Sequence, residues 1–120
     1  MTVLRWLRAG TVRDEGSVTV EAALGIAALI VVIGLGAAGA AAALTQIGLV
    51  DAAREAARVA AMAGPGAGVS AGQAAAPGAQ VSVDGSGSHV TAVVVAPARG
   101  LPGLELRARA VARSEPGVAG

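Results

Sequence analysis

The stretch Gly16-Ser17-Val18-Thr19-Val20-Glu21, with the apolar run Ala22–Leu44 that follows it, decides the fold of this 120-residue chain. The run contains no charged residue and no proline. It is long enough for a membrane-spanning helix, which needs about 20 predominantly apolar residues. The sequence therefore predicts one transmembrane helix, with a lipid bilayer as its surroundings.

Glu21 is a carboxylate that stands directly before the first residue of this run. An ionisable side chain inside a membrane segment costs roughly 2.5–3.5 kcal/mol on insertion scales, so it is a candidate functional residue by default. Three arginines, Arg5, Arg8 and Arg13, precede the run. They favour a cytoplasmic N-terminus and an extracytoplasmic C-terminus in a single-pass protein of the cell membrane.

The composition limits what the rest of the chain can be. The chain is 54% hydrophobic but has only one aromatic residue, so the part outside the run has few large side chains for a core. Such a small module gains its stability from a partner or from an attached helix. The absence of cysteine excludes a disulfide scaffold and a thiolate metal site. A net charge of +1, spread along the chain, indicates no nucleic-acid partner.

The helix is expected to continue out of the bilayer, so that residues 17–63 form one element ended by Gly64-Pro65-Gly66. Small and apolar residues recur beyond the run at three- and four-residue spacing, as expected for a helix face that packs on something. These residues are Ile47, Val50, Ala53, Ala57 and Ala60. Asp51 with Arg54, and Glu55 with Arg58, are spaced to form ion pairs on a solvated face.

The C-terminal part changes to the period of β-strands. After a Gly/Pro/Ala linker at 64–78, with room for one helical turn from Ser70 to Ala76, the segments 80–83 and 89–96 predict a hairpin around a turn at 84–87. Residues 104–110 alternate apolar and charged side chains. The sequence therefore predicts a small module of three antiparallel strands at 79–114, followed by a flexible tail at 115–120.

Two other interpretations of the apolar run were weighed. A secretory signal peptide would be cleaved near Ala38-Gly39-Ala40 or Ala40-Ala41-Ala42, but the run continues past both sites without a break. The segment 34–39 matches the G-x-G-x-x-G pattern of dinucleotide-binding folds, yet no second strand ending in an acid follows it. The small residues of the run are instead expected to let membrane helices approach closely. They are Gly25, Gly36, Gly39, Ala40 and Ala43.

Candidate catalytic chemistry is scarce. His89, Ser88 and Asp84 lie in or beside the hairpin turn, where adjacent residues cannot form a triad. The sequence therefore predicts a protein that is not an enzyme and that needs no metal or cofactor. Arg107 and Arg109 fall on one face of the last strand and form a candidate surface for an acidic partner.

The chain resembles the TadE-like pseudopilins of the Tad/Flp pilus system in four features taken together. They are the Gly16–Glu21 stretch, the apolar helix, the segment Asp51-Ala-Ala-Arg-Glu-Ala-Ala-Arg58 and the valine-rich hairpin. The resemblance implies an α+β membrane protein with a pilin-like β module. It also implies a leader at 1–16, cleavage between Gly16 and Ser17 by a prepilin peptidase, and Glu21 as a determinant of assembly register. In many members of this pilin group an aromatic residue stands where this chain has Ala22.

The partners implied by the resemblance are other pilin or pseudopilin subunits and the assembly platform of a pilus or related secretion system. Incorporation into a surface filament is compatible with it. The alternative is a plain single-pass membrane protein whose extracytoplasmic β module binds a partner at the cell surface.

Overall fold

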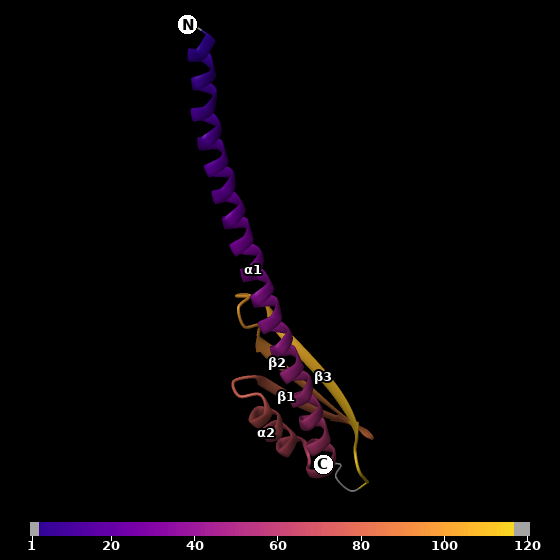
Figure 1. Ribbon diagram of the computed structural model, residues 1–120. Helices are drawn as coiled ribbons and strands as arrows, with labels where there is room; N and C mark the ends of the chain where they lie inside the picture. Colours follow the sequence, from indigo (N-terminus) through magenta and orange to yellow (C-terminus); the bar gives the residue numbers. More distant parts are fainter. Residues whose placement is uncertain (1–2, 117–120) are drawn as a thin grey trace. The chain divides into compact units, whose positions relative to one another are not determined.

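The computed structural model describes the backbone of residues 3–116 and the side chains of residues 14–116. Its elements are α1 (Val3–Ala63), α2 (Pro65–Ala75), β1 (Gln80–Ser86), β2 (His89–Pro97) and β3 (Glu105–Arg113) (Figure 1). The expected α+β layout, one long apolar N-terminal helix and a three-stranded antiparallel sheet, is confirmed. The side chains of Arg5, Arg8 and Arg13, and tail residues 117–120, lie outside the described residues.

The chain divides into two units, residues 1–37 and 38–120. In the first unit, exposed apolar side chains cover every side of α1. The large hydrophobic residues from Val18 to Leu35 are 58–66% exposed. A soluble helix hides one such face, whereas a helix that is apolar on every side needs an apolar environment. Among the described residues, α1 is the one helix long and apolar enough to cross a membrane, and its most apolar stretch of 18 residues has a mean hydropathy of 2.4.

The second unit is built on an antiparallel sheet with strand order β1-β2-β3. Ser86 pairs with His89, so a two-residue turn, Gly87-Ser88, joins the first two strands. Gly87 has φ +60, a conformation that such tight turns require and that glycine adopts without strain. The turn expected at 84–87 is therefore wrong in position, because β1 extends through Asp84 to Ser86.

The C-terminal part of α1 packs against one face of the sheet (Figure 1). Its buried residues are Leu49, Ala52, Ala53, Ala56, Ala57, Ala60 and Ala61, and those of the strands are Val90, Ala92, Val94 and Ala108. Because alanine side chains are so short, helix and sheet can approach closely. Ile47 was expected on this face, which is wrong: it is 59% exposed, and Leu49 begins the buried stripe.

The expected linker at 64–78 is replaced over most of its length by an 11-residue helix, α2. Gly64, with φ +95, separates α1 from α2, and Pro65 begins the new helix, where its missing N–H costs nothing. Gly68 and Gly72 are buried. A Cβ atom at position 68 would lie 2.5 Å from the Cβ of Ala60, so α2 lies directly on α1.

Candidate functional site

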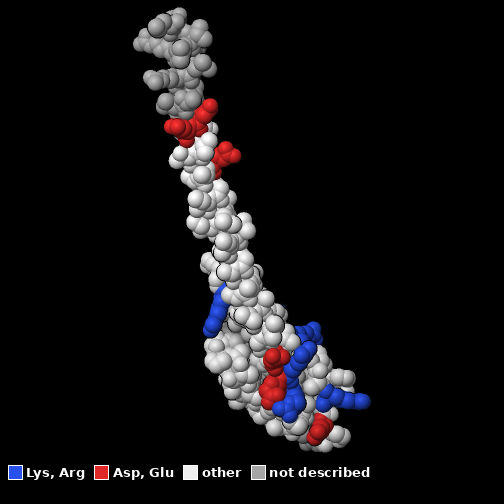
Figure 2. Space-filling model, viewed as in Figure 1, with Lys and Arg blue, Asp and Glu red and all other residues white. Residues whose placement is uncertain are grey.

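The predicted processing site is exposed on α1 in the first unit. Gly16, Ser17 and Glu21 are all accessible, and Ser17 and Glu21 lie one helical turn apart. Between them, Thr19 donates its hydroxyl to the carbonyl oxygen of Glu15 over 3.0 Å, which satisfies this polar group inside the helix. Beyond Glu21 the surface is uncharged as far as Asp51 in the sequence, and Figure 2 shows the apolar part of the helix without charged side chains.

The predicted packing residues have room for a neighbouring helix. At Gly25, Gly36 and Gly39, no atom of the rest of the described chain lies within 4 Å of the place that a Cβ would take. Ala40 and Ala43 are likewise exposed. These five small residues are therefore accessible for contacts with other helices, and the contacts themselves stay a prediction.

Arg107 and Arg109 lie on the sheet face that α1 does not cover. Both are exposed, and the register places them opposite Val95 and Val93 of the central strand. On the other side of the same two valines stand Gln80 and Ser82 of β1. The uncovered face thus has a stripe of half-buried valines with two arginines along one side and two neutral polar residues along the other.

β3 is an edge strand, because the sheet ends there. In a two-residue hairpin the residues that close the turn, here Ser86 and His89, exchange backbone hydrogen bonds, and the bonding direction then alternates along each strand. By this alternation, the N–H and C=O groups of the odd-numbered residues of β3 point away from β2. The open edge therefore includes the backbone groups of Arg109 and Val111.

Two hydrogen bonds tie this edge to α1 at its ends. The side-chain amide of Gln46 donates to the carbonyl oxygen of Arg107 over 3.0 Å, and the N–H of Glu115, just past the strand, donates to the carbonyl oxygen of Ala61 over 3.2 Å. Between these ties, the edge at 109–113 has no strand beside it in the described part of the chain.

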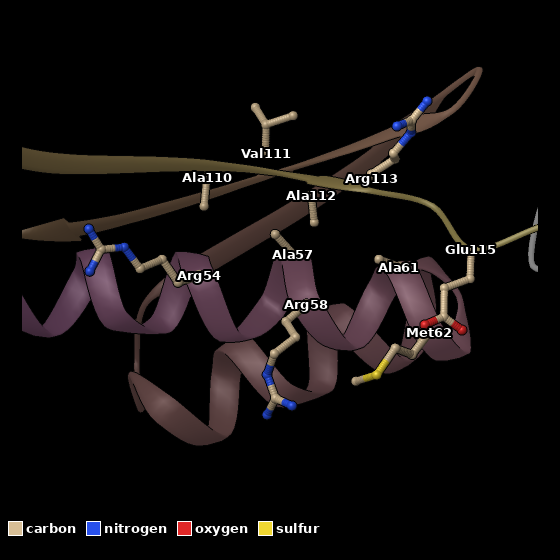
Figure 3. Close-up of a pocket in the computed structure, with 10 residues that line it drawn as sticks. All are labelled: Arg54, Ala57, Arg58, Ala61, Met62, Ala110, Val111, Ala112, Arg113 and Glu115. Atoms are coloured by element: carbon tan, nitrogen blue, oxygen red, sulfur yellow. The ribbon is translucent and has the colours of Figure 1, made fainter.

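A groove of about 290 Å³ lies along this part of the edge, between α1 and β3. Figure 3 shows Ala110 and Ala112 directed toward the helix and Val111 and Arg113 directed away from it. Its other lining residues are Arg54, Ala57, Arg58, Ala61, Met62 and Glu115. We name this cavity the edge groove. Its floor is apolar, and three arginines and one carboxylate surround it.

The arginines of α1 differ in how firmly they are held. Arg58 forms a bidentate contact with Glu55 at 2.8 Å, whereas Arg54 and Asp51 are 4.0 Å apart and both more than 70% exposed. Both i,i+3 pairs expected from the sequence are therefore present. Exposed pairs of this kind contribute little to stability, so Arg54 is available to an anionic group in the edge groove.

Sequence reasoning missed the edge groove, because its lining residues are separated by about half the chain. Gln46, which ties β3 to α1, gives no local signal either, because its partner is a backbone carbonyl 61 residues away.

The residues around the hairpin turn do not form a catalytic arrangement. The Ser88 hydroxyl and His89 Nδ1 lie 3.1 Å apart, and both side chains are exposed. Among the described residues there is no group of three or more His, Cys, Asp or Glu side chains that could hold a metal ion.

Comparison with known proteins gives one informative match. The chain is 42% identical over 98 residues to a protein named Apoptosis inhibitor Rv3655c from Mycobacterium tuberculosis (strain ATCC 25618 / H37Rv), and the match covers 81% of this chain and 78% of that protein. No family model matches the chain. No solved structure matches it either.

Proposed function

This chain belongs to the family of the Mycobacterium tuberculosis protein named Apoptosis inhibitor Rv3655c, and within that family we propose that it acts as a TadE-like pseudopilin. In this role it is a non-enzymatic, membrane-anchored component of a Tad/Flp-type pilus or a related secretion machine. A prepilin peptidase removes residues 1–16. The helix then holds the β module outside the cytoplasmic membrane, where it contacts other subunits and the assembly platform.

One observation carries the proposal: the first unit exposes a helix that is apolar on every side from Ala22 onward, and the carboxylate of Glu21 directly precedes this apolar part. A plain anchor has no use for this carboxylate, which raises the cost of insertion. A subunit that must align with identical or related helices in a bundle has a use for it, because a buried charge is tolerated only opposite its partner.

The N-terminal mass of the chain after extraction from membranes tests this proposal. We expect the mass of a chain that begins at Ser17. A chain that begins near Ala41–Ala43 would instead identify a secretory signal peptide, and a chain that still begins at Met1 would favour the plain single-pass protein. Both of those results would contradict processing as a pseudopilin.

The second candidate function is the binding of a partner by the β module. The edge groove favours it, because an open strand edge offers backbone groups to an extended peptide. The name of the 42% identical relative describes an inhibitor of apoptosis. A role of that kind in this chain would require recognition of another protein, and the edge groove and the arginines of β3 are the surfaces available for it.

Charge reversal on β3 probes both functions. Arg107→Glu combined with Arg109→Glu is expected to weaken pilus assembly, measured as surface filaments at unchanged protein level, because an acidic partner would then meet like charges. Gln80→Glu combined with Ser82→Glu is the matched control, since these positions flank the same valines from the other side. Equal assembly by all variants would mean that the arginines only keep this face soluble.

A further inference from the structure

A second cavity, of about 570 Å³, lies in the C-terminal unit at the end where α1 leaves the apolar run. Leu44, Thr45, Gly48 and Leu49 of α1 form one wall, and the loop 75–79 with the end of β2 forms the other. Its volume is in the range of pockets that bind small molecules. We name it the basal cavity.

All but two of the residues that line the basal cavity are apolar, and the two are Thr45 and Arg99. Thr45 donates its hydroxyl to the carbonyl oxygen of Ala41 over 3.0 Å, so it offers no free donor. The other side chains are alanine, leucine and proline, except for Arg99, the one charged lining residue. Within the described residues Arg99 forms no ion pair, whereas Arg54 and Arg58 each face an acid. The cavity thus combines an apolar wall with one cationic group.

The two loops beside the basal cavity are also without charge, apart from Arg99. The segments 76–79 and 98–104 contain no acidic residue and no charge other than Arg99. The second of them exposes Leu104 and Pro102 and lies against α1 at Ala38. Gly100 makes that contact with φ +80, a conformation that glycine adopts without strain, and a Cβ there would be in ordinary contact with Ala38 at 3.4 Å.

The depth of the basal cavity follows from its place on α1. The apolar run ends at Leu44, and the wall on α1 runs from Ala41 to Leu49, about 12 Å along a helix. Each polar layer of a bilayer is about 5–7 Å thick. If the run spans the membrane, this wall begins among the acyl chains and passes through the headgroups.

We propose that the basal cavity holds an anionic phospholipid of the outer leaflet, with its phosphate on Arg99 and the upper part of an acyl chain against Leu44, Gly48 and Leu49. The β module then lies on the membrane surface instead of standing away from it. This inference rests on the membrane insertion proposed above. An arginine beside an apolar groove fits this ligand because the two parts of a phospholipid, an anionic headgroup and a hydrocarbon chain, need these two surfaces.

The test uses the full chain reconstituted in bilayers of phosphatidylcholine mixed with phosphatidylglycerol. After mild detergent extraction, the lipid that remains bound is identified and counted by native mass spectrometry. The parent chain is expected to retain phosphatidylglycerol in preference to phosphatidylcholine. A phosphatidylglycerol with a photoactivatable group near its glycerol should cross-link to the segments 41–49 and 75–79.

Two variants address the two halves of the site. Arg99→Gln should lower the retention of phosphatidylglycerol about fivefold, and Arg109→Gln, which removes another exposed arginine, on the sheet and outside the basal cavity, should leave it unchanged. Gly48→Leu should fill the basal cavity and displace the acyl chain. The protein should tolerate this change, because no atom lies within 4 Å of a Cβ at this position. Gly34→Leu adds the same side chain to α1 outside the cavity and is its control.

The outcomes separate this inference from the function on which it rests. Failure to insert in the bilayer overturns both. Normal insertion without preferential retention, or retention that neither Arg99→Gln nor Gly48→Leu reduces, overturns the lipid site alone. Photo-cross-links from a probe placed at 75–79 to a second copy of the chain would show that another subunit fills the basal cavity. This result also overturns the lipid site.

Discussion

Glu21→Ala is expected to enter the membrane at least as well as the parent chain, to be cleaved after Gly16, and yet to lose co-purification with other pilus components. The proposed cleavage would place a positively charged amine on Ser17, one turn from Glu21 on the same side of the helix, where the two could pair within one chain. In the proposed bundle, the carboxylate would pair with the amine of a neighbouring subunit. A subunit displaced along the bundle would leave both charges unpaired in lipid, so this pairing would fix the axial register.

Val20→Ala is the control for this experiment, because it trims an adjacent exposed side chain and keeps the charge. Membrane fractionation and the N-terminal mass report insertion and cleavage, and affinity purification from cells that make the whole system reports assembly. Normal co-assembly of the Glu21→Ala protein would falsify the register role. The carboxylate would then only reach to the headgroups, and the pseudopilin proposal would depend on the cleavage site alone.

Gly68→Ala is expected to destabilise the C-terminal unit by about 1–3 kcal/mol, although alanine is the better helix former. The added Cβ would lie 2.5 Å from the Cβ of Ala60 and 2.7 Å from the carbonyl oxygen of Ala56. The second contact is with helix backbone, which cannot turn away as a flexible side chain does. Helix α2 must therefore move off α1, and Val81, which contacts α2 at Gly72, loses part of its cover.

Gly66→Ala provides the opposite result in the same helix. No atom lies within 4 Å of a Cβ at position 66, so this change should stabilise the unit by about 0.5–1 kcal/mol through the lower flexibility of the unfolded chain. Amide hydrogen exchange of β1 and β2 in the detergent-solubilised full chain measures both variants. Equal protection in the two variants would mean that α2 does not lie on α1 as described.

The strands were predictable because their signals are local. The alternation in β1 and β3 and the β-branched run of β2 each predict a strand from a few consecutive residues. The tight turn between β1 and β2 is favoured by a glycine, Gly87. Antiparallel pairing in chain order then follows from the short connections. The error at the turn arose because Asp84 and Gly85 have turn propensity but are held in the ladder opposite Thr91 and Val90.

Helix α2 was not predictable in the same way. Its sequence contains Gly66, Gly68 and Gly72 after a proline, and local propensity assigns such a segment to a linker. The two inner glycines are instead what allows α2 to contact α1 and Val81. This stabilisation is tertiary, so no pattern within the segment reveals it. The edge groove and the basal cavity were missed for the same reason, since each is lined by segments far apart in the sequence.

The short side chains between α1 and the sheet also determine which substitutions the family can accept. Six alanines of α1 are at most 5% exposed, and a larger residue at these positions would force α1 apart from the sheet or from α2. These positions can exchange for little other than glycine or serine. The leucine, isoleucine and valine residues from Leu24 to Leu35 are 58–66% exposed and can exchange among themselves without a clash inside the described chain. The alanine-rich composition is thus in part imposed by the fold, and the least distinctive residues of the sequence are among its least replaceable.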